Sequence, residues 1–116
     1  KERNIERLTL QHLQGFKIVA VKDIVYLEAD RNYTVFHLAS REKVMVSRNM
    51  GEYEDLLDPD VFFRVHKSFI INLHHLKEYS TADGYFAVMQ DSISVIVSRR
   101  RVDEFMVAIK RFTSLK

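Results

Sequence analysis

Short runs of β-branched and aromatic residues, broken by turns of a few polar residues, are the feature that most limits how this chain can fold. Such residues favour strands because they pack well on a pleated surface. The pairs Arg41-Glu42 and Asp91-Ser92 and the triplet Ala82-Asp83-Gly84 predict tight turns. The pattern therefore predicts a meander and a late hairpin, and not the strand–helix alternation of a parallel sheet. The predicted strands are FKIVAVK (16–22), DIVYLEA (23–29), YTVFHL (33–38), KVMVS (43–47), YFAVMQ (85–90) and ISVIVS (93–98).

Two segments change to the period of a helix. The internal one is short, and Asp58-Pro59 should end it; its apolar residues are Met50, Tyr53, Leu56 and Leu57. The C-terminal one is stronger, and Ser98 could cap its start; its apolar stripe is Val102, Phe105, Met106, Ile109 and Phe112. Burial of each such side chain contributes roughly 1.5–3 kcal/mol, so we expect this helix to dock on the sheets.

Length and composition indicate one globular domain. The chain has 116 residues, of which 47% are hydrophobic and 29% charged, as is usual for such proteins. No apolar run approaches the ~18 residues that a membrane span needs, and no signal peptide is evident. The absence of cysteine suits a reducing cytoplasm. Because the first residues, KERNIER, are charged and lack an initiating Met, we interpret residues 1–6 as a linker remnant and residues 7–116 as the domain.

The charges are unevenly distributed. The segment GEYEDLLDPD (51–60) has five acidic residues and no basic one. Without it the chain has 18 basic and 11 acidic residues, a net charge of +7 in place of +2. From Ser98 onward there are six basic and two acidic residues, and Arg99, Arg100 and Arg101 are consecutive. A near-neutral total can therefore hide a basic face opposite an acidic one, although an ordinary mixed surface has the same counts.

Motifs of catalysis and metal binding are missing. Five histidines are present, but no H-x-x-x-H pair, H-E-x-x-H motif or cysteine supports a zinc site. His74 and His75 are best explained by a polar turn after Leu73. Ser68 lies near His66, but there is no G-x-S-x-G motif, and the three glycines are too isolated for a phosphate loop. We therefore expect no enzyme, no metal and no cofactor.

The stretch FFRVHKSFIINL (62–73) has apolar flanks around a polar centre with Lys67 in it. Two further points combine basic or amide side chains with a structural break, Asp30-Arg31-Asn32 and Ser98-Arg99-Arg100-Arg101. Arg and Lys can bind the paired acceptors of guanine in the major groove, Asn can bind adenine, and all can hold phosphates. Three arginines at a helix start are unfavourable unless an anion compensates them. These points suit nucleic-acid binding, but three arginines at a helix start are more often a solvated charged face, so the residues alone leave both interpretations open.

The chain resembles the LytTR DNA-binding domain, the output domain of many bacterial response regulators, over about residues 5 to 112. The motifs that carry the resemblance are D-I-V-Y-L-E-A (23–29), N-Y-T-V (32–35), F-F-R-V-H-K-S-F-I-I-N-L (62–73) and S-R-R-R (98–101), followed by the terminal amphipathic helix. The resemblance implies a mainly β fold with several small antiparallel sheets, one short internal helix and a C-terminal amphipathic helix. It also implies that loops, and not a recognition helix, read double-stranded DNA.

The resemblance further implies specific roles. Asn32, Lys67 and Arg100 are the expected base-reading residues, with Arg31 as a substitute for Asn32 because that loop varies in length in the family. Lys67 stands where relatives often have Arg, and without the planar guanidinium its base selectivity should be softer. Phe69 stands where the family often has Tyr. The expected phosphate or supporting contacts are Arg31, Arg48, His66, Ser68, Arg99 and Arg101.

Two polar residues in the central stretch are expected to be structural. Arg64 should pair with a carboxylate such as Glu28, and Asn72 should satisfy backbone groups at a strand end. The acidic segment 51–60 should face away from the duplex, because its carboxylates would repel phosphates.

The whole protein is expected to be a cytoplasmic transcription regulator with no membrane partner. An N-terminal receiver domain, phosphorylated by a histidine kinase, would promote pairing with a second protomer on imperfect direct repeats of DNA. The alternative is a protein-interaction module without direct DNA binding. Salt dependence separates the two, because DNA binding weakens steeply as salt rises.

Overall fold

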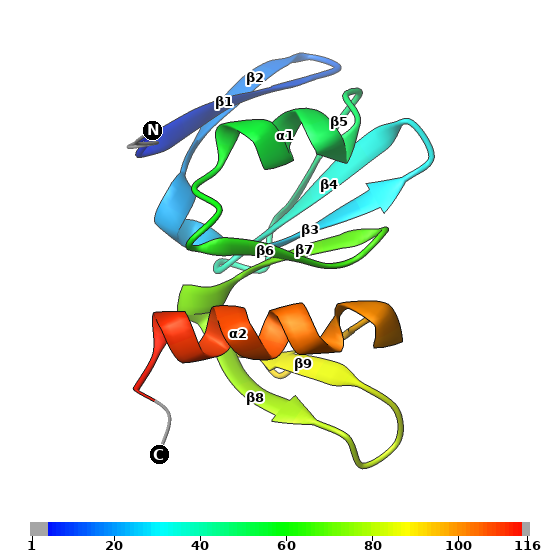
Figure 1. Cartoon of the computed structure of the whole chain (residues 1–116). Coiled ribbons are helices and arrows are strands. Elements are labelled where there is room, and N and C mark those ends of the chain that lie inside the picture. Colours follow the sequence, from blue (N-terminus) through cyan, green and yellow to red (C-terminus); the bar gives the residue numbers. More distant parts are fainter. Residues whose placement is uncertain (1–4, 115–116) are drawn as a thin grey trace.

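Three antiparallel sheets lie one above another in the computed structural model, which describes residues 5–114 (Figure 1). The central sheet has the order β5-β4-β3-β7-β6. Its strands are β3 (Ile24–Asp30), β4 (Tyr33–Leu38), β5 (Lys43–Val46), β6 (Phe62–His66) and β7 (Phe69–Asn72). The outer sheets comprise β1 (Arg7–His12) with β2 (Gly15–Ala20), and β8 (Leu76–Ser80), β9 (Phe86–Met89) and β10 (Ser94–Ile96). The α-helices are α1 (Met50–Leu56) and α2 (Val102–Phe112), and the 3-10 turns are η1 (Val21–Asp23), η2 (Leu73–His75) and η3 (Arg99–Arg101).

The predicted fold class is confirmed: the fold is mainly β, with small antiparallel sheets, one short internal helix and one C-terminal helix. The strand expected over 16–22 ends at Ala20, because the chain turns through η1 before β3. Strands β1 and β8 were not predicted, and strands β6 and β7 were expected only from the apolar flanks of 62–73, without bounds. The exposed positions of β1 and β8 are polar, so β1 presents only Leu8 and Leu10 to the core.

One side of the central sheet packs against α1 and the β1–β2 hairpin, as Figure 1 shows. Asn49 caps α1, because its side chain accepts a hydrogen bond from the Glu52 backbone N–H. Tyr53 meets Phe36 of β4 edge to face, with ring centroids 4.8 Å apart. Leu56 was expected on the same apolar face as Met50, but it is exposed. The reason is that Leu56 lies about 120° around the helix axis from Met50. This packing fixes α1 above the central sheet.

The other side of the central sheet packs against α2 and the β8–β9–β10 sheet. Phe105 of α2 is fully buried and stacks on Phe63 of β6, with centroids 5.4 Å apart. The predicted apolar stripe of α2 is confirmed, since all five of its residues belong to this second core. Strand β3 contributes to both cores, with Ile24 and Leu27 in the first and Val25 and Tyr26 in the second, and its register shift lies between Ile24 and Tyr26.

The prediction that Ser98 caps α2 is wrong. The Ser98 side chain makes no cap hydrogen bond, and the Ser98 carbonyl instead accepts one from the Arg101 N–H within η3. The helix begins at Val102, and its first turn carries Asp103 and Glu104. Acidic side chains at this position stabilise a helix N-terminus, so they offset the unfavourable charge of the three arginines.

The proposed linker lies mostly outside the described residues, which begin at Ile5. Within them, the Glu6 carbonyl accepts a hydrogen bond from the Val21 N–H at 2.8 Å. Glu6 is therefore tied to the fold. No helix within residues 5–114 is long and apolar enough to cross a membrane.

Candidate nucleic-acid interface

The β3–β4 turn and the β6–β7 turn lie at the same edge of the central sheet. Strands β3 and β7 are antiparallel neighbours, so the end of β3 meets the start of β7. The Ala29 N–H donates to the Ser68 carbonyl at 2.8 Å. Asn32 and Lys67, both exposed, therefore extend from adjacent turns (right side of Figure 1).

The third predicted point, η3, is tied to the same edge. The Ser98 N–H donates to the Val65 carbonyl at 2.7 Å, just after the end of β10. Val65 is fully buried, so this link rests on the core. Arg99 and Arg100 follow at once, are exposed, and have no side-chain hydrogen bond or ion pair within residues 5–114. We call the β3–β4 turn (31–32), the β6–β7 turn (67–68) and Arg99–Arg100 together the basic edge.

The β3–β4 turn holds only two residues between the paired Asp30 and Tyr33. Arg31 has φ 60°, in the left-handed region that non-glycine residues rarely adopt. A positive φ at the first central position is the pattern of a type II′ turn, whose twist matches that of the strands. The turn presents Arg31 and Asn32 to solvent, and Tyr33 beside them is 44% exposed.

The β6–β7 turn explains the polar break in the central stretch. A register shift between Arg64 and His66 interrupts regular pairing, which resumes with His66 opposite Phe69. The His66 Nδ1 accepts a hydrogen bond from the Ser68 N–H at 3.0 Å, so the imidazole shapes the turn. Arg64 donates from Nη2 to the Lys67 carbonyl. Lys67 alone among these turn side chains is exposed, and its ammonium has no described partner within residues 5–114.

Arg101 differs from its two neighbours. Its guanidinium lies 4.7 Å from the centroid of the Phe63 ring, and its Nε donates to the Arg64 carbonyl at 2.9 Å. Its Nη1 pairs with Glu104 of α2. The predicted role of Arg101 at phosphates therefore competes with three existing contacts.

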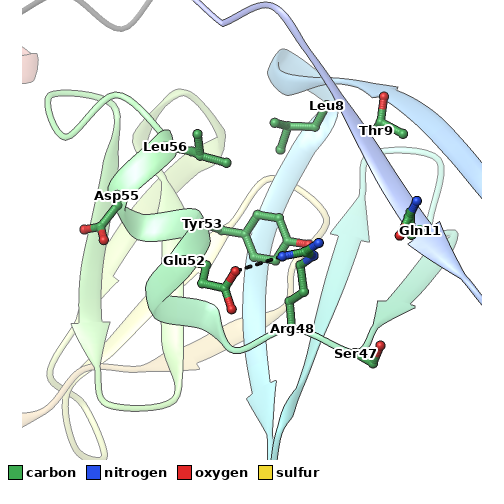
Figure 2. Close-up of a pocket in the computed structure, with 9 residues that line it drawn as sticks. All are labelled: Leu8, Thr9, Gln11, Ser47, Arg48, Glu52, Tyr53, Asp55 and Leu56. Carbon is green, nitrogen blue, oxygen red and sulfur yellow. Dashed lines mark hydrogen bonds and ion pairs between the residues drawn. The ribbon is translucent and has the colours of Figure 1, made fainter.

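Arg48 lies beside the β3–β4 turn. The fully buried Thr34 at the start of β4 donates from Oγ1 to the Arg48 carbonyl at 2.7 Å. The Arg48 Nη1 lies 3.0 Å from Glu52 Oε1, as drawn in Figure 2. Both residues line a groove of about 860 Å³ between β1 and α1. Burial raises the pKa of Tyr53 in the same groove, and the charge of Arg48 opposes that rise.

Arg64 pairs with a carboxylate as predicted, but the partner is Glu54 and not Glu28. The Arg64 Nη1 lies 2.8 Å from Glu54 Oε1. Strand β7 separates β6 from β3, so Glu28 is two strands away and instead contacts His37 of β4 at 2.8 Å. The prediction for Asn72 is confirmed, since its amide binds the Ile24 carbonyl and the His74 N–H, each at 2.9 Å.

An aromatic cluster supports the sheet below both turns. The Tyr26 ring stacks on His37, with centroids 4.0 Å apart, and tilts against Phe69 at 6.2 Å. Burial raises the pKa of Tyr26 to about 12, and the carboxylates of Glu28 and Asp91 add to the rise. The phenol is therefore neutral at pH 7 and packs without adding charge. Within the described residues, no three acidic or histidine side chains are placed to hold a metal ion.

Comparison with known proteins identifies the family. The LytTr DNA-binding domain family matches residues 14–110, which is most of the chain. The chain belongs to this family. Among solved structures, the LytTr DNA-binding domain of a methyl-accepting/DNA response regulator from Bacillus cereus aligns with a TM-score of 0.79 and 27% identity. The alignment covers 91% of this chain and 98% of that domain, so the LytTr fold extends through nearly all of it.

Curated relatives of this LytTr domain are longer regulators. The transcriptional regulatory protein YpdB of Escherichia coli K12 is 34% identical over 91 residues, 76% of this chain and 37% of YpdB. The CO-responsive transcriptional regulator RcoM of Rhodospirillum rubrum is 32% identical over 66% of this chain and 32% of RcoM. The transcriptional regulatory protein LytR of Staphylococcus aureus is 26% identical over 76% of this chain and 36% of LytR. The LytTr domain thus spans about a third of the length of these relatives.

Two ion pairs of the acidic segment were not predicted from the sequence. Glu52 and Glu54 pair with Arg48 and Arg64, next to the basic edge of the LytTr domain. The spacing of four residues from Arg48 to Glu52 is a helical ion-pair signal present in the sequence. No comparable signal joins Glu54 to Arg64, because ten residues and a change of element separate them. Whether the rest of the acidic segment faces away from DNA stays a prediction.

Proposed function

We propose that this LytTr domain binds double-stranded DNA sequence-specifically through the basic edge. The observation that carries the proposal is that three exposed basic or amide tips, distant in sequence, are joined at one edge by main-chain hydrogen bonds. Loop side chains mounted on a packed sheet are held in fixed relative positions, which suits the reading of bases. The family to which the chain belongs supports DNA as the ligand.

Within this proposal, Lys67 and Arg100 bind guanine acceptors in the major groove, and Asn32 binds adenine. Arg31, Arg48 and Arg99 contact phosphates, because their side chains are exposed at or beside the same edge. His66 and Ser68 support the turn that carries Lys67. Arg101 holds η3 in place, since its guanidinium already binds protein groups.

Selection from random duplex DNA tests the proposal. The purified domain and a Lys67→Ala/Arg100→Ala variant are each used to enrich binding sites at low salt. We expect the parent to enrich a short motif and the variant to enrich none. Failure of the parent to enrich any motif would contradict sequence-specific binding.

Salt titration separates DNA binding from the alternative, a protein-interaction module. For each phosphate neutralised, the slope of log affinity against log salt should be about −0.9. A steep slope with the selected duplex supports the basic edge as a DNA surface. A flat slope would favour the protein-interaction module, which the family match does not favour.

For the whole protein, we propose a cytoplasmic transcription regulator without a catalytic role for this domain. Two relatives named as transcriptional regulatory proteins support the role in transcription. Because the chain covers little more than a third of each, those proteins contain further segments outside the matched domain. A receiver domain phosphorylated by a histidine kinase would then raise the local concentration of a second protomer on imperfect direct repeats. The CO-responsive relative shows that the signal can differ among such regulators. Binding to duplexes with one or two half-sites, measured with phosphorylated and unphosphorylated full-length protein, tests this step.

A further inference from the structure

Arg64 joins α1 to the turn that carries Lys67. Its Nη1 lies 2.8 Å from Glu54 Oε1, and its Nη2 donates to the main-chain carbonyl of Lys67. The Arg64 side chain is 31% exposed and the Glu54 side chain 45%. A planar guanidinium can bind two acceptors at a fixed angle, so both contacts form together. The orientation of the Lys67 peptide thus depends on a carboxylate from another element.

The main chain of Arg64 also joins this turn to η3. Its carbonyl accepts the hydrogen bond from Arg101 Nε at 2.9 Å, while the guanidinium of Arg101 covers the Phe63 ring. The next carbonyl, of Val65, accepts from the Ser98 N–H. Lys67 and Arg100 are therefore both mounted on a segment of β6 that includes Arg64.

We propose that Arg64, held by Glu54, is a positioning residue that fixes the Lys67 turn for base reading and sets its spacing from Arg100. The inference rests on the proposed function, since it assigns the residues that orient the reading side chains. We call Glu54, Arg64 and Arg101 the brace.

The need for a brace follows from Lys67 itself. A lysine ammonium is a point charge on a flexible stem, so base selectivity depends on how firmly its backbone is held. The register shift leaves Val65 of β6 without a partner on β7, two residues before Lys67, so only the His66–Phe69 pair closes the turn. The charge-assisted hydrogen bond from Arg64 to the Lys67 carbonyl supplies a further fixed contact there.

The charge of Arg64 separates positioning from phosphate binding. Because Glu54 neutralises the guanidinium, Arg64 in the brace adds no counterion release on binding DNA. Loss of Arg64 should therefore change which base is preferred without changing the salt dependence. A phosphate contact would behave in the opposite way.

The experiment uses Arg64→Met, Glu54→Gln and a matched control, Glu52→Gln, which breaks the neighbouring ion pair with Arg48 and leaves the brace intact. Affinities are measured for the selected duplex and for duplexes with each base replaced at the positions whose preference Lys67→Ala or Arg100→Ala removes. Salt slopes are measured in parallel, and thermal unfolding reports folding. Because Glu54 is exposed, Glu54→Gln tests the proposal even if Arg64→Met does not fold.

We expect Arg64→Met and Glu54→Gln to reduce base discrimination at the Lys67 position by about three- to tenfold, with an unchanged salt slope in Arg64→Met. Glu52→Gln should leave discrimination there unchanged. Retained discrimination in both brace variants would overturn the inference, as would a salt slope reduced by about 0.9 in Arg64→Met. Higher affinity of Glu54→Gln without a change in preference would also overturn it, because Glu54 would then act only by repelling DNA. If the parent selects no sequence, the proposed function itself fails, whereas selection by the parent with unaffected brace variants removes only the inference.

Discussion

The two turns at the centre of the basic edge are held in different ways. The β6–β7 turn receives side-chain contacts from Arg64 and His66, and Arg64 is itself held from α1. The side chains of Arg31 and Asn32 in the β3–β4 turn have no hydrogen bond or ion pair within residues 5–114, and the pairing of Asp30 with Tyr33 closes this turn. The difference predicts that the β6–β7 turn is ordered before DNA binds, while the side chains of Arg31 and Asn32 become ordered on the duplex. The four predictions below test this difference.

The largest expected effect is on binding through the braced turn. Lys67→Ala should cost about 1–3 kcal/mol of binding free energy and remove preference at one base. Asn32→Ala should cost about 1 kcal/mol less, because ordering an unbraced side chain already takes about 0.5–1.5 kcal/mol from its contribution. Fluorescence titration of the selected duplex measures both. Equal losses would mean that bracing has no bearing on the contribution of each turn.

Two adjacent arginines of η3 should differ in their effects, Arg101 on the stability of the fold and Arg100 on base preference. Arg101→Ala should lower the free energy of unfolding by about 1–2 kcal/mol, because it removes the contact with Phe63 and the bond to the Arg64 carbonyl. Arg100→Ala should change stability by less than about 0.5 kcal/mol while removing preference at one base. Urea unfolding and duplex competition report the two quantities. An unchanged free energy of unfolding in Arg101→Ala would contradict the structural role of Arg101 and favour the original prediction that it contacts phosphate.

Removal of the strain from the positive φ of Arg31, in the β3–β4 turn, should give a smaller effect, a gain in the free energy of unfolding instead of a loss. Arg31→Gly should raise the free energy of unfolding by about 0.5–1 kcal/mol, because glycine adopts this conformation without steric cost. The same variant should reduce the salt slope by about 0.9 if Arg31 contacts a phosphate. Arg41→Gly is the matched control, since Arg41 has φ 75° in the β4–β5 turn at the opposite end of the sheet. It should gain similar stability with no change in DNA binding.

The smallest effect at neutral pH is expected in the aromatic cluster below both turns. The folded-state pKa of Tyr26 is raised from 10.0 to about 12, so the neutral phenol is favoured by folding. Its contribution to stability is complete below pH 10 and is lost as the pH rises through 12. Tyr26→Phe should therefore lose less stability than the parent between pH 10 and 12, as measured by urea unfolding at each pH. Parallel pH curves for the two proteins would contradict the raised pKa.

Periodicity and turn residues predicted most of the fold, because each predicted element has a strong local pattern. The strand expected over 33–38 is β4 with the same bounds, and the stripe containing Phe105 is the buried face of α2. Strand β1 was not predicted because only Leu8 and Leu10 mark its buried face. A short amphipathic strand at a chain end gives too weak a pattern to separate from a charged linker.

The candidate site was predicted as a set of residues but not as an arrangement. The sequence does not distinguish the three consecutive arginines of η3. Only the turn of η3 places Arg101 on the Phe63 ring and leaves Arg99 and Arg100 exposed. The partner of Arg64 depends on strand order, which places β7 between β6 and Glu28. Long-range pairing of this kind has no local signal, so the brace could be recognised only in three dimensions.

The pairing of Glu54 with Arg64 also bears on attempts to redirect this domain to a new operator. An exchange of Lys67 alone would alter the chemical group presented to the bases and keep its mounting. A transplant of the β6–β7 hairpin (62–72) into a related scaffold would carry Arg64 away from Glu54, because that carboxylate belongs to a different element. Under the proposed function, the unit to exchange is therefore the hairpin together with α1 and η3, and engineered specificity should be exchanged in blocks of that size.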